Sequence, residues 1–147
     1  MTRKRDDSAT FKIGQLAELS GVSIDTVRYY EREGLLPKPA RRASGYREYR
    51  EADAERLRFI RRAKELGFSL TEIAELLSLT DDRHADMRGV KRKAEERLSQ
   101  VERKITELRR VKHGLEELIA ACPGHGELAR CPIVAALSRE TRTRKER

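Results

Sequence analysis

The chain has 147 residues, of which 39% are charged and 37% hydrophobic, and its formal net charge is +8 at pH 7. This composition excludes a large compact core and fits one small domain or two, built from helices that each bury one apolar stripe. No apolar run approaches the roughly 20 residues of a membrane span, and the N-terminus does not look like a signal peptide, so we expect a cytoplasmic protein without a membrane partner. The positive charge favours a polyanionic partner, with nucleic acid first.

A pair of short helices joined by a tight turn is predicted to follow a flexible arm, residues 1–10. The first helix has a short apolar face made of Ile13, Leu16, Ala17 and Leu19. Gly21 suits a left-handed turn, and Ser23 can cap a second helix that Gly34 ends. The predicted inward face of this second helix consists of Ile24, Val27 and Tyr30. Two short helices around such a turn are typical of a helix-turn-helix.

The outward face of the second helix and the irregular segment after it form the candidate DNA-reading surface. We expect that face to carry Thr26, Arg28, Tyr29 and Arg32. Forked arginine donors suit guanine edges and phosphates, and hydroxyl groups suit phosphates. Residues 35–49 contain prolines and a glycine, so we predict a loop with a small hairpin, or wing. The wing adds Arg41, Arg42, Tyr46 and Arg47, with Arg50 as a further candidate.

Two more helices complete a predicted DNA-binding domain over residues 11–80. The first covers residues 51–66, and Gly67 stops it. Its apolar positions are Leu57, Ile60 and Leu66. Ser69 and Glu72 have the spacing of a capping box, which opens the next helix. The predicted apolar face of that helix consists of Leu70, Ile73, Ala74 and Leu77.

A long helix is predicted over residues 86–121, after a polar connector. Its seam has a spacing of three and four residues and consists of Leu98, Val101, Ile105, Leu108, Lys112, Leu115 and Ile119. Val111 lies beside the break at Lys112. One helix cannot bury a narrow heptad seam by itself, so we expect it to pair with a second copy in a homodimer. Packing of the seam onto the chain's own N-terminal domain is the alternative.

The two cysteines, Cys122 and Cys131, follow the long helix and are the candidate metal ligands. Pro132 favours a helix start, so the Cys131 thiol should lie at a helix N-terminus, where thiolates are stabilised. The intervening loop contains two glycines and can bring both sulfurs to one soft ion, such as Cu(I) or Zn(II). We therefore predict a metal-binding loop and short helix over residues 122–138 and a disordered basic tail over 139–147. Two inert thiols, or a redox pair, are the alternatives.

Other functions are not supported by the sequence. There is no phosphate-binding glycine loop, no HExxH motif and no nucleophile with its base, so we do not expect an enzyme. An iron–sulfur cluster requires four thiolates where only two exist. About 26 residues follow the long helix, which is too few for a separate domain that binds drugs.

The segment IGQLAELSGVSIDTVRYYEREGLLPKPAR, followed by SGYREY and later by LGFSL, closely resembles the MerR family of transcription regulators. The resemblance implies a mainly α fold with a winged helix-turn-helix and an antiparallel coiled coil that joins two subunits. It also implies binding to a near-palindromic promoter whose spacer is too long for RNA polymerase. When the inducer binds, such regulators bend and untwist the DNA, which brings the promoter elements into register.

The resemblance also bears on the metal. Sensors of divalent ions in this family generally use a third cysteine near the start of the partner's long helix, where this chain has Met87. Sensors of monovalent ions lack that cysteine and hold the ion between two thiolates. One Cu(I) ion per chain, held by Cys122 and Cys131, is therefore favoured. A Zn(II) or other divalent-metal sensor that adds His125, His84 or His113 is an alternative, as is a thiol redox sensor.

Overall fold

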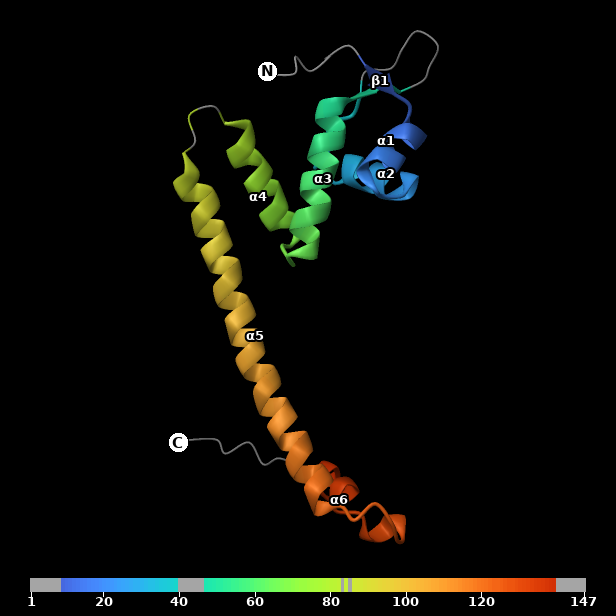
Figure 1. The fold of residues 1–147 in the computed structure, drawn as a ribbon, viewed down its shortest axis with the longest axis vertical. Helices are drawn as coiled ribbons and strands as arrows, with labels where there is room; N and C mark the ends of the chain where they lie inside the picture. The colour runs from blue at the N-terminus through green and yellow to red at the C-terminus, as the bar shows by residue number, and fades with distance from the viewer. Residues whose placement is uncertain (1–8, 40–46, 83, 85, 140–147) are drawn as a thin grey trace, which may run out of the picture. The chain divides into compact units, whose positions relative to one another are not determined.

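The structure is a computed structural model that describes residues 9–39, 47–82, 84 and 86–139. It divides into two units, Met1–Arg97 and Leu98–Arg147. The described elements of the first unit are β1 (Thr10–Phe11), α1 (Ile13–Ser20), α2 (Ile24–Arg32), β2 (Tyr49–Arg50), α3 (Glu51–Glu65), α4 (Leu70–Asp81) and the start of α5 (Met87–Ala121). The second unit contains the rest of α5, a 3₁₀ turn (Leu128–Arg130) and α6 (Pro132–Ser138). The predicted mainly helical fold is confirmed (Figure 1).

Helices α1 and α2 form the predicted helix-turn-helix. Gly21 lies in the left-handed region, with φ +68°, directly after α1. Ser23 caps α2, because its Oγ accepts a hydrogen bond of 3.1 Å from the backbone N–H of Thr26. Gly34, with φ +75°, follows the end of α2. A glycine turn and a serine cap thus fix where both helices begin and end.

A short antiparallel pair of strands brings the start of the domain next to the end of the wing segment. Thr10 pairs with Arg50 and Phe11 pairs with Tyr49. Thr10 therefore differs from our expectation of a flexible arm through residue 10, because its backbone pairs with β2. The same pairing places the fully buried Tyr49 ring against the core of the domain.

Helix α3 contacts both α1 and α4, and Figure 1 shows it between α4 and the α1–α2 pair. The core of the unit gathers apolar side chains from all four helices and from the segment after α2. Its fully buried members are Leu16, Val27, Leu36, Tyr49, Leu57, Ile60 and Ile73. The predicted capping box is confirmed, since Ser69 and Glu72 each accept a hydrogen bond from the other's backbone N–H.

Four predicted core positions were wrong. Leu19 and Ile24 are 48% and 39% exposed, and Leu66 is 54% exposed because α3 already ends at Glu65. In α4 the buried face includes Leu76 in place of Ala74, which is exposed. Apart from Leu66, these errors share a cause: helical spacing gives the face, but the width of the buried arc depends on the neighbouring helix.

The start of α5 is held on α3 and α4 by basic side chains. Arg97 Nε donates a 3.0 Å hydrogen bond to the carbonyl oxygen of Leu66, and Lys93 forms an ion pair with Glu75. Gly67, with φ +83°, leaves room for this contact, because a Cβ there would lie 2.1 Å from the Arg97 guanidinium. No helix in the described part of the chain is long and apolar enough to cross a membrane.

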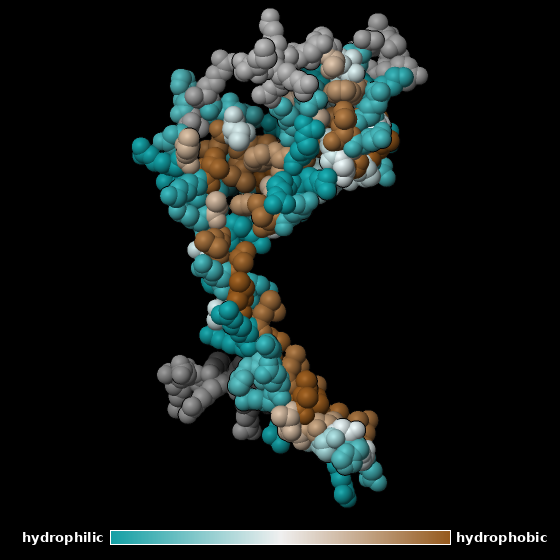
Figure 2. Space-filling view, in the orientation of Figure 1, coloured by the Kyte–Doolittle hydropathy of each residue, from teal (hydrophilic) through white to brown (hydrophobic). Residues whose placement is uncertain are grey.

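Within the second unit, α5 carries an apolar stripe that the described residues leave exposed. Figure 2 shows this stripe along one side of the helix. Its members are 42–66% exposed and consist of Leu98, Ile105, Leu108, Val111, Leu115 and Ile119. Six large apolar side chains in one row on a charged helix indicate a surface that is buried in an assembly.

Candidate DNA-binding surface and candidate metal site

The outward face of α2 presents the cations expected there. Arg28, Tyr29 and Arg32 are exposed, whereas Val27 and Tyr30 on the opposite face are buried. Thr26 is only partly exposed, and its Oγ1 lies 2.8 Å from Ser23 Oγ. The Thr26 hydroxyl thus already contacts the capping residue of α2. The two arginines and Tyr29 are the more exposed polar side chains of this face.

A surface hollow lies beside α2, and basic side chains from several parts of the first unit line it. Its cationic lining residues are Lys12, Arg28, Arg32, Lys38 and Arg47. The acidic groups of the same lining are Glu18 and the buried Glu31. A concave surface with this excess of positive charge attracts phosphate groups through both charge and hydrogen bonding.

Glu31 is a buried carboxylate on α2 that the sequence analysis did not single out. It is 4% exposed, and Arg47 Nη1 donates to its Oε2 at 2.6 Å. The hydroxyl group of Tyr49 donates to the other carboxylate oxygen. Burial, followed by the hydrogen bond to Glu31, raises the pKa of Tyr49 to about 12, so this donor stays protonated at neutral pH. The network ties the end of the predicted wing segment to α2.

The wing residues predicted to contact DNA have different outcomes. Arg47 belongs to the hollow but holds Glu31, so the structure gives it a positioning role beside any contact with phosphate. Arg50 is exposed, and its backbone N–H donates to Asp53 at the start of α3. Arg41, Arg42 and Tyr46 lie outside the described residues.

In the second unit, the loop between α5 and α6 brings the two cysteines together. Cys122 directly follows α5, and its backbone N–H donates to the carbonyl oxygen of Ile119 at 3.2 Å. Cys131 is the residue before α6, with Pro132 in the first turn as predicted. Both thiols are free and half-buried. A pocket lined by residues 122–128 and 130–132 surrounds them.

The local environment of Cys131 favours its thiolate. The pKa of this thiol is lowered chiefly by the hydrogen bond from the backbone N–H of Val134. Burial opposes this shift, and weaker hydrogen bonds from the Ile133 N–H and the Cys122 thiol add to it. The amide groups belong to the first turn of α6, where helix N–H groups have no partner within the helix. Two adjacent sulfurs, one of them with a lowered thiol pKa, are a donor set that fits a soft metal ion.

The histidines predicted as possible extra ligands are spread apart. His125 Nδ1 lies 3.1 Å from the carbonyl oxygen of Pro123 in the same loop. His113 Nε2 lies 3.2 Å from Glu117 Oε1, and His84 lies in the connector before α5. Among the described residues, no group of three or more histidine, cysteine or acidic side chains could hold a metal ion. The single chain thus offers the two thiols as its soft donors at this place.

A helix-turn-helix with a cationic hollow, together with an uncovered apolar helix and a paired-thiol loop, defines a DNA-binding regulator with a separate sensing segment. Comparison with known proteins agrees. Residues 11–80 match the MerR HTH family regulatory proteins, and residues 54–118 match the MerR DNA-binding family. The chain belongs to the MerR family.

Individual relatives extend this similarity over most of the chain. A mercuric resistance operon regulatory protein of Bacillus cereus is 40% identical over 88% of this chain and 98% of its own length. A transcription regulator of Ralstonia metallidurans in complex with lead(II) has a TM-score of 0.80, with 35% identity over 87% of this chain and 99% of that one. A MerR of Bacillus megaterium in complex with mercury(II) has a TM-score of 0.71, with 37% identity over 88% and 100%.

These relatives confirm the predicted family and support its metal-responsive type. They also confirm that the chain is a DNA-binding regulator and not an enzyme. The preference for Cu(I) is not confirmed, because the metals named for these relatives are mercury and lead.

Proposed function

We propose that this protein is a cytoplasmic, metal-responsive regulator that binds a near-palindromic promoter as a homodimer. One soft metal ion per chain, bound by Cys122 and Cys131, switches it to distort the DNA so that RNA polymerase can use the promoter. The observation that carries the proposal is the cysteine pair: the two thiols are neighbours, and α6 turns two backbone N–H groups toward one of them. The DNA-reading face is on a different part of the chain, as a switch requires.

The proposed DNA contacts centre on α2 and the adjoining hollow. Arg28 and Arg32 point outward from a helix whose other face is anchored in the core by Val27. Helices held in this way present their side chains to the major groove or to the phosphates next to it. Arg42, Tyr46 and Arg47 of the wing segment are proposed to extend the surface to neighbouring phosphates.

Replacing Arg28 with alanine should weaken operator binding by about 10- to 100-fold, because a charged, forked donor is lost from the recognition face. Arg62→Ala is the matched control, since Arg62 is an exposed arginine of α3 that pairs with Glu65. Gel-shift titration of both variants measures the difference. Equal affinity of the Arg28→Ala variant and the parent protein would contradict the assignment of α2 as recognition helix.

The proposed homodimer forms through the apolar stripe of α5. Leu108→Ala should weaken the dimer by about 2 kcal/mol or more, roughly 30-fold in its dissociation constant, because each copy of the stripe loses a large buried side chain. Arg109→Ala changes the next residue of the same helix, which lies off the stripe, and should leave the dimer intact. Sedimentation equilibrium measures both. An unchanged Leu108→Ala dimer would show that the stripe is not the interface.

Cu(I) is the proposed ion because the donor set is small and soft. Two thiolates around a monovalent ion leave one net negative charge, which the N-terminus of α6 can offset. Divalent ions usually take three or four ligands, and among the described residues no group of three or more histidine, cysteine or acidic side chains is placed to hold an ion. Bound there, the ion would link the end of α5 to the start of α6.

Two other inducers have support of their own. The relatives that bind mercury(II) and lead(II) favour a divalent ion, for which His125 in the same loop is the available additional donor. The contact between the two thiols favours a disulfide-forming redox sensor. These candidates differ in the ligands that they need, so metal-binding experiments on the cysteine and histidine variants separate them.

The switch itself is tested on DNA. An operator duplex is first selected from a random library with the purified dimer, and its bend is then measured by circular permutation with and without Cu(I), Zn(II) or Hg(II). We expect Cu(I) to change the bend without releasing the protein, because the proposed output is deformation and not dissociation. A bend that responds to no ion, or protein release by Cu(I), would contradict the proposed function.

A further inference from the structure

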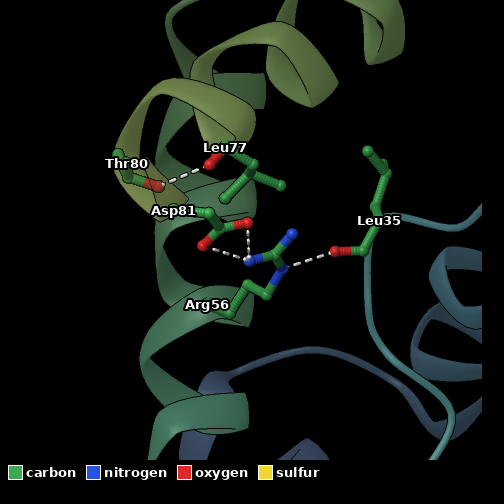
Figure 3. A network of polar contacts seen from close by, with 5 residues as sticks. All are labelled: Leu35, Arg56, Leu77, Thr80 and Asp81. Carbon is green, nitrogen blue, oxygen red and sulfur yellow. Dashed lines mark hydrogen bonds and ion pairs between the residues drawn. The ribbon is translucent and has the colours of Figure 1, made fainter. Parts of the chain in front are cut away.

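One arginine of α3 joins two segments of the DNA-binding unit that are far apart in the sequence. Arg56 Nε donates a 2.7 Å hydrogen bond to the carbonyl oxygen of Leu35, and Nη1 lies 3.1 Å from both carboxylate oxygens of Asp81 (Figure 3). A single guanidinium thus contacts the segment that leaves the recognition helix and the last residue of α4.

The Leu35 end of this contact is fixed to the recognition helix. The backbone N–H groups of Leu35 and Leu36 both donate to the carbonyl oxygen of Tyr30, at 2.9 and 3.3 Å. The two leucine side chains are 3% and 1% exposed. Any displacement of the Leu35 carbonyl is therefore shared with the end of α2, which carries the DNA-reading face.

The Asp81 end lies where the chain turns from α4 toward α5. Asp81 is the last residue of α4, and only residues 82–86 separate it from Met87, where α5 begins. A carboxylate at a helix C-terminus is unfavourable, because it meets the negative end of the helix dipole. The Arg56 guanidinium offsets that charge; the Arg56 side chain is 22% exposed and that of Asp81 is 59% exposed.

We propose that Arg56 is a positioning residue that couples the connector before α5 to the exit of the recognition helix. This inference rests on the proposed function, in which a metal ion bound next to the end of α5 changes the shape of bound DNA. Since α5 is continuous from Met87 to Ala121 and Cys122 follows it, a shift of α5 on metal binding reaches the connector through the helix itself. The guanidinium holds both segments at once, so Asp81 cannot move relative to Leu35 without breaking one contact.

Asp81→Ala is the main test, because it removes one contact while relieving the unfavourable charge at the end of α4. Relief of that charge opposes the loss of the ion pair, so its fold stability should change little. Urea unfolding checks this and separates loss of switching from unfolding. We expect unchanged Cu(I) affinity and operator affinity, with the metal-dependent gain in transcription reduced about tenfold, which is within the range of coupling changes seen for such residues. Arg56→Lys, which cannot fork between two partners, should show the same loss.

Arg58→Gln is the matched control, since Arg58 lies on the same helix and pairs with Glu51 of that helix. It should retain the parent response. A parent-like response of Asp81→Ala, or an equal loss in Arg58→Gln, would overturn the coupling role of Arg56. A parent protein that gives no response to metal would contradict the proposed function. A parent protein that responds, together with a parent-like response of Asp81→Ala, would contradict the coupling role of Arg56 alone.

Discussion

A Cys131→Ser variant is expected to lose the transcriptional response to metal completely while it keeps the dimer and the operator affinity of the parent. A two-ligand site loses half of its donors when one sulfur is removed, and a serine hydroxyl is a poor ligand for a soft ion. The change is nearly isosteric, and Cys131 lies in the second unit, outside the DNA-reading face. In vitro transcription with Cu(I), alongside a gel-shift titration, measures both properties.

The remaining cysteine and the loop histidine provide the controls. Cys122→Ser should show the same loss, because the two sulfurs act as one donor set. His125→Ala should keep the response to Cu(I), since its Nδ1 lies next to a backbone carbonyl oxygen of the loop. A serine variant at either cysteine that still activates with metal would show that this loop is not the sensor.

Glu31→Ala is expected to cause the largest loss of stability among changes in the DNA-binding unit outside its apolar core. It leaves the hydroxyl group of the fully buried Tyr49 without its acceptor, and it removes the partner of Arg47. Leaving the buried Tyr49 donor without its acceptor and breaking a partly buried ion pair together cost about 3 kcal/mol. Urea unfolding at equal protein concentration measures the change, since a dimer's stability depends on concentration.

Two related variants separate the charge from the hydrogen bond. Glu33→Ala, an exposed glutamate two residues further along, should change the stability by about 0.5 kcal/mol or less. Glu31→Gln keeps an acceptor for Tyr49 but loses the charge that holds Arg47, so its loss should be intermediate. If Glu31→Ala were as stable as Glu33→Ala, the network would not hold the wing segment on α2.

The sequence was sufficient to place the starts of α2 and α4 and the turn after α1. The capping and turn residues there are Ser23, Ser69 and Gly21. They contact residues close by in the chain, so their roles can be predicted from the sequence alone. The same holds for Cys131 before Pro132. The start of a helix and the position of its thiol are local properties.

The contacts that the sequence did not reveal all depend on residues distant in the chain. In the sequence, Glu31 is one of several charges on a polar helix. Its role depends on Tyr49, which is 18 residues later and which β2 places beside it. Arg56 and Asp81 are 25 residues apart. Likewise, Leu76 is buried and Ala74 exposed because the position of α3 against α4 decides which arc is covered. Sequence periodicity predicts which face of a helix is apolar, but the packing of neighbouring helices decides which residues of that face are buried.

The candidate metal site could be placed from the sequence, but the identity of its ion could not. The pair of cysteines and the absence of a cysteine near Met87 are legible in one chain. A ligand contributed by a second subunit is a property of the assembly, and coordination number decides between monovalent and divalent ions.

The most direct test of the two-thiolate site is an anaerobic titration of the reduced protein with Cu(I) and Zn(II), each against a competing chelator. The proposal predicts one tightly bound Cu(I) per chain, weak Zn(II) binding, and loss of the Cu(I) site in the Cys122→Ser variant. Tight Zn(II) with weak Cu(I), or Cu(I) binding that survives the loss of Cys122, would contradict it.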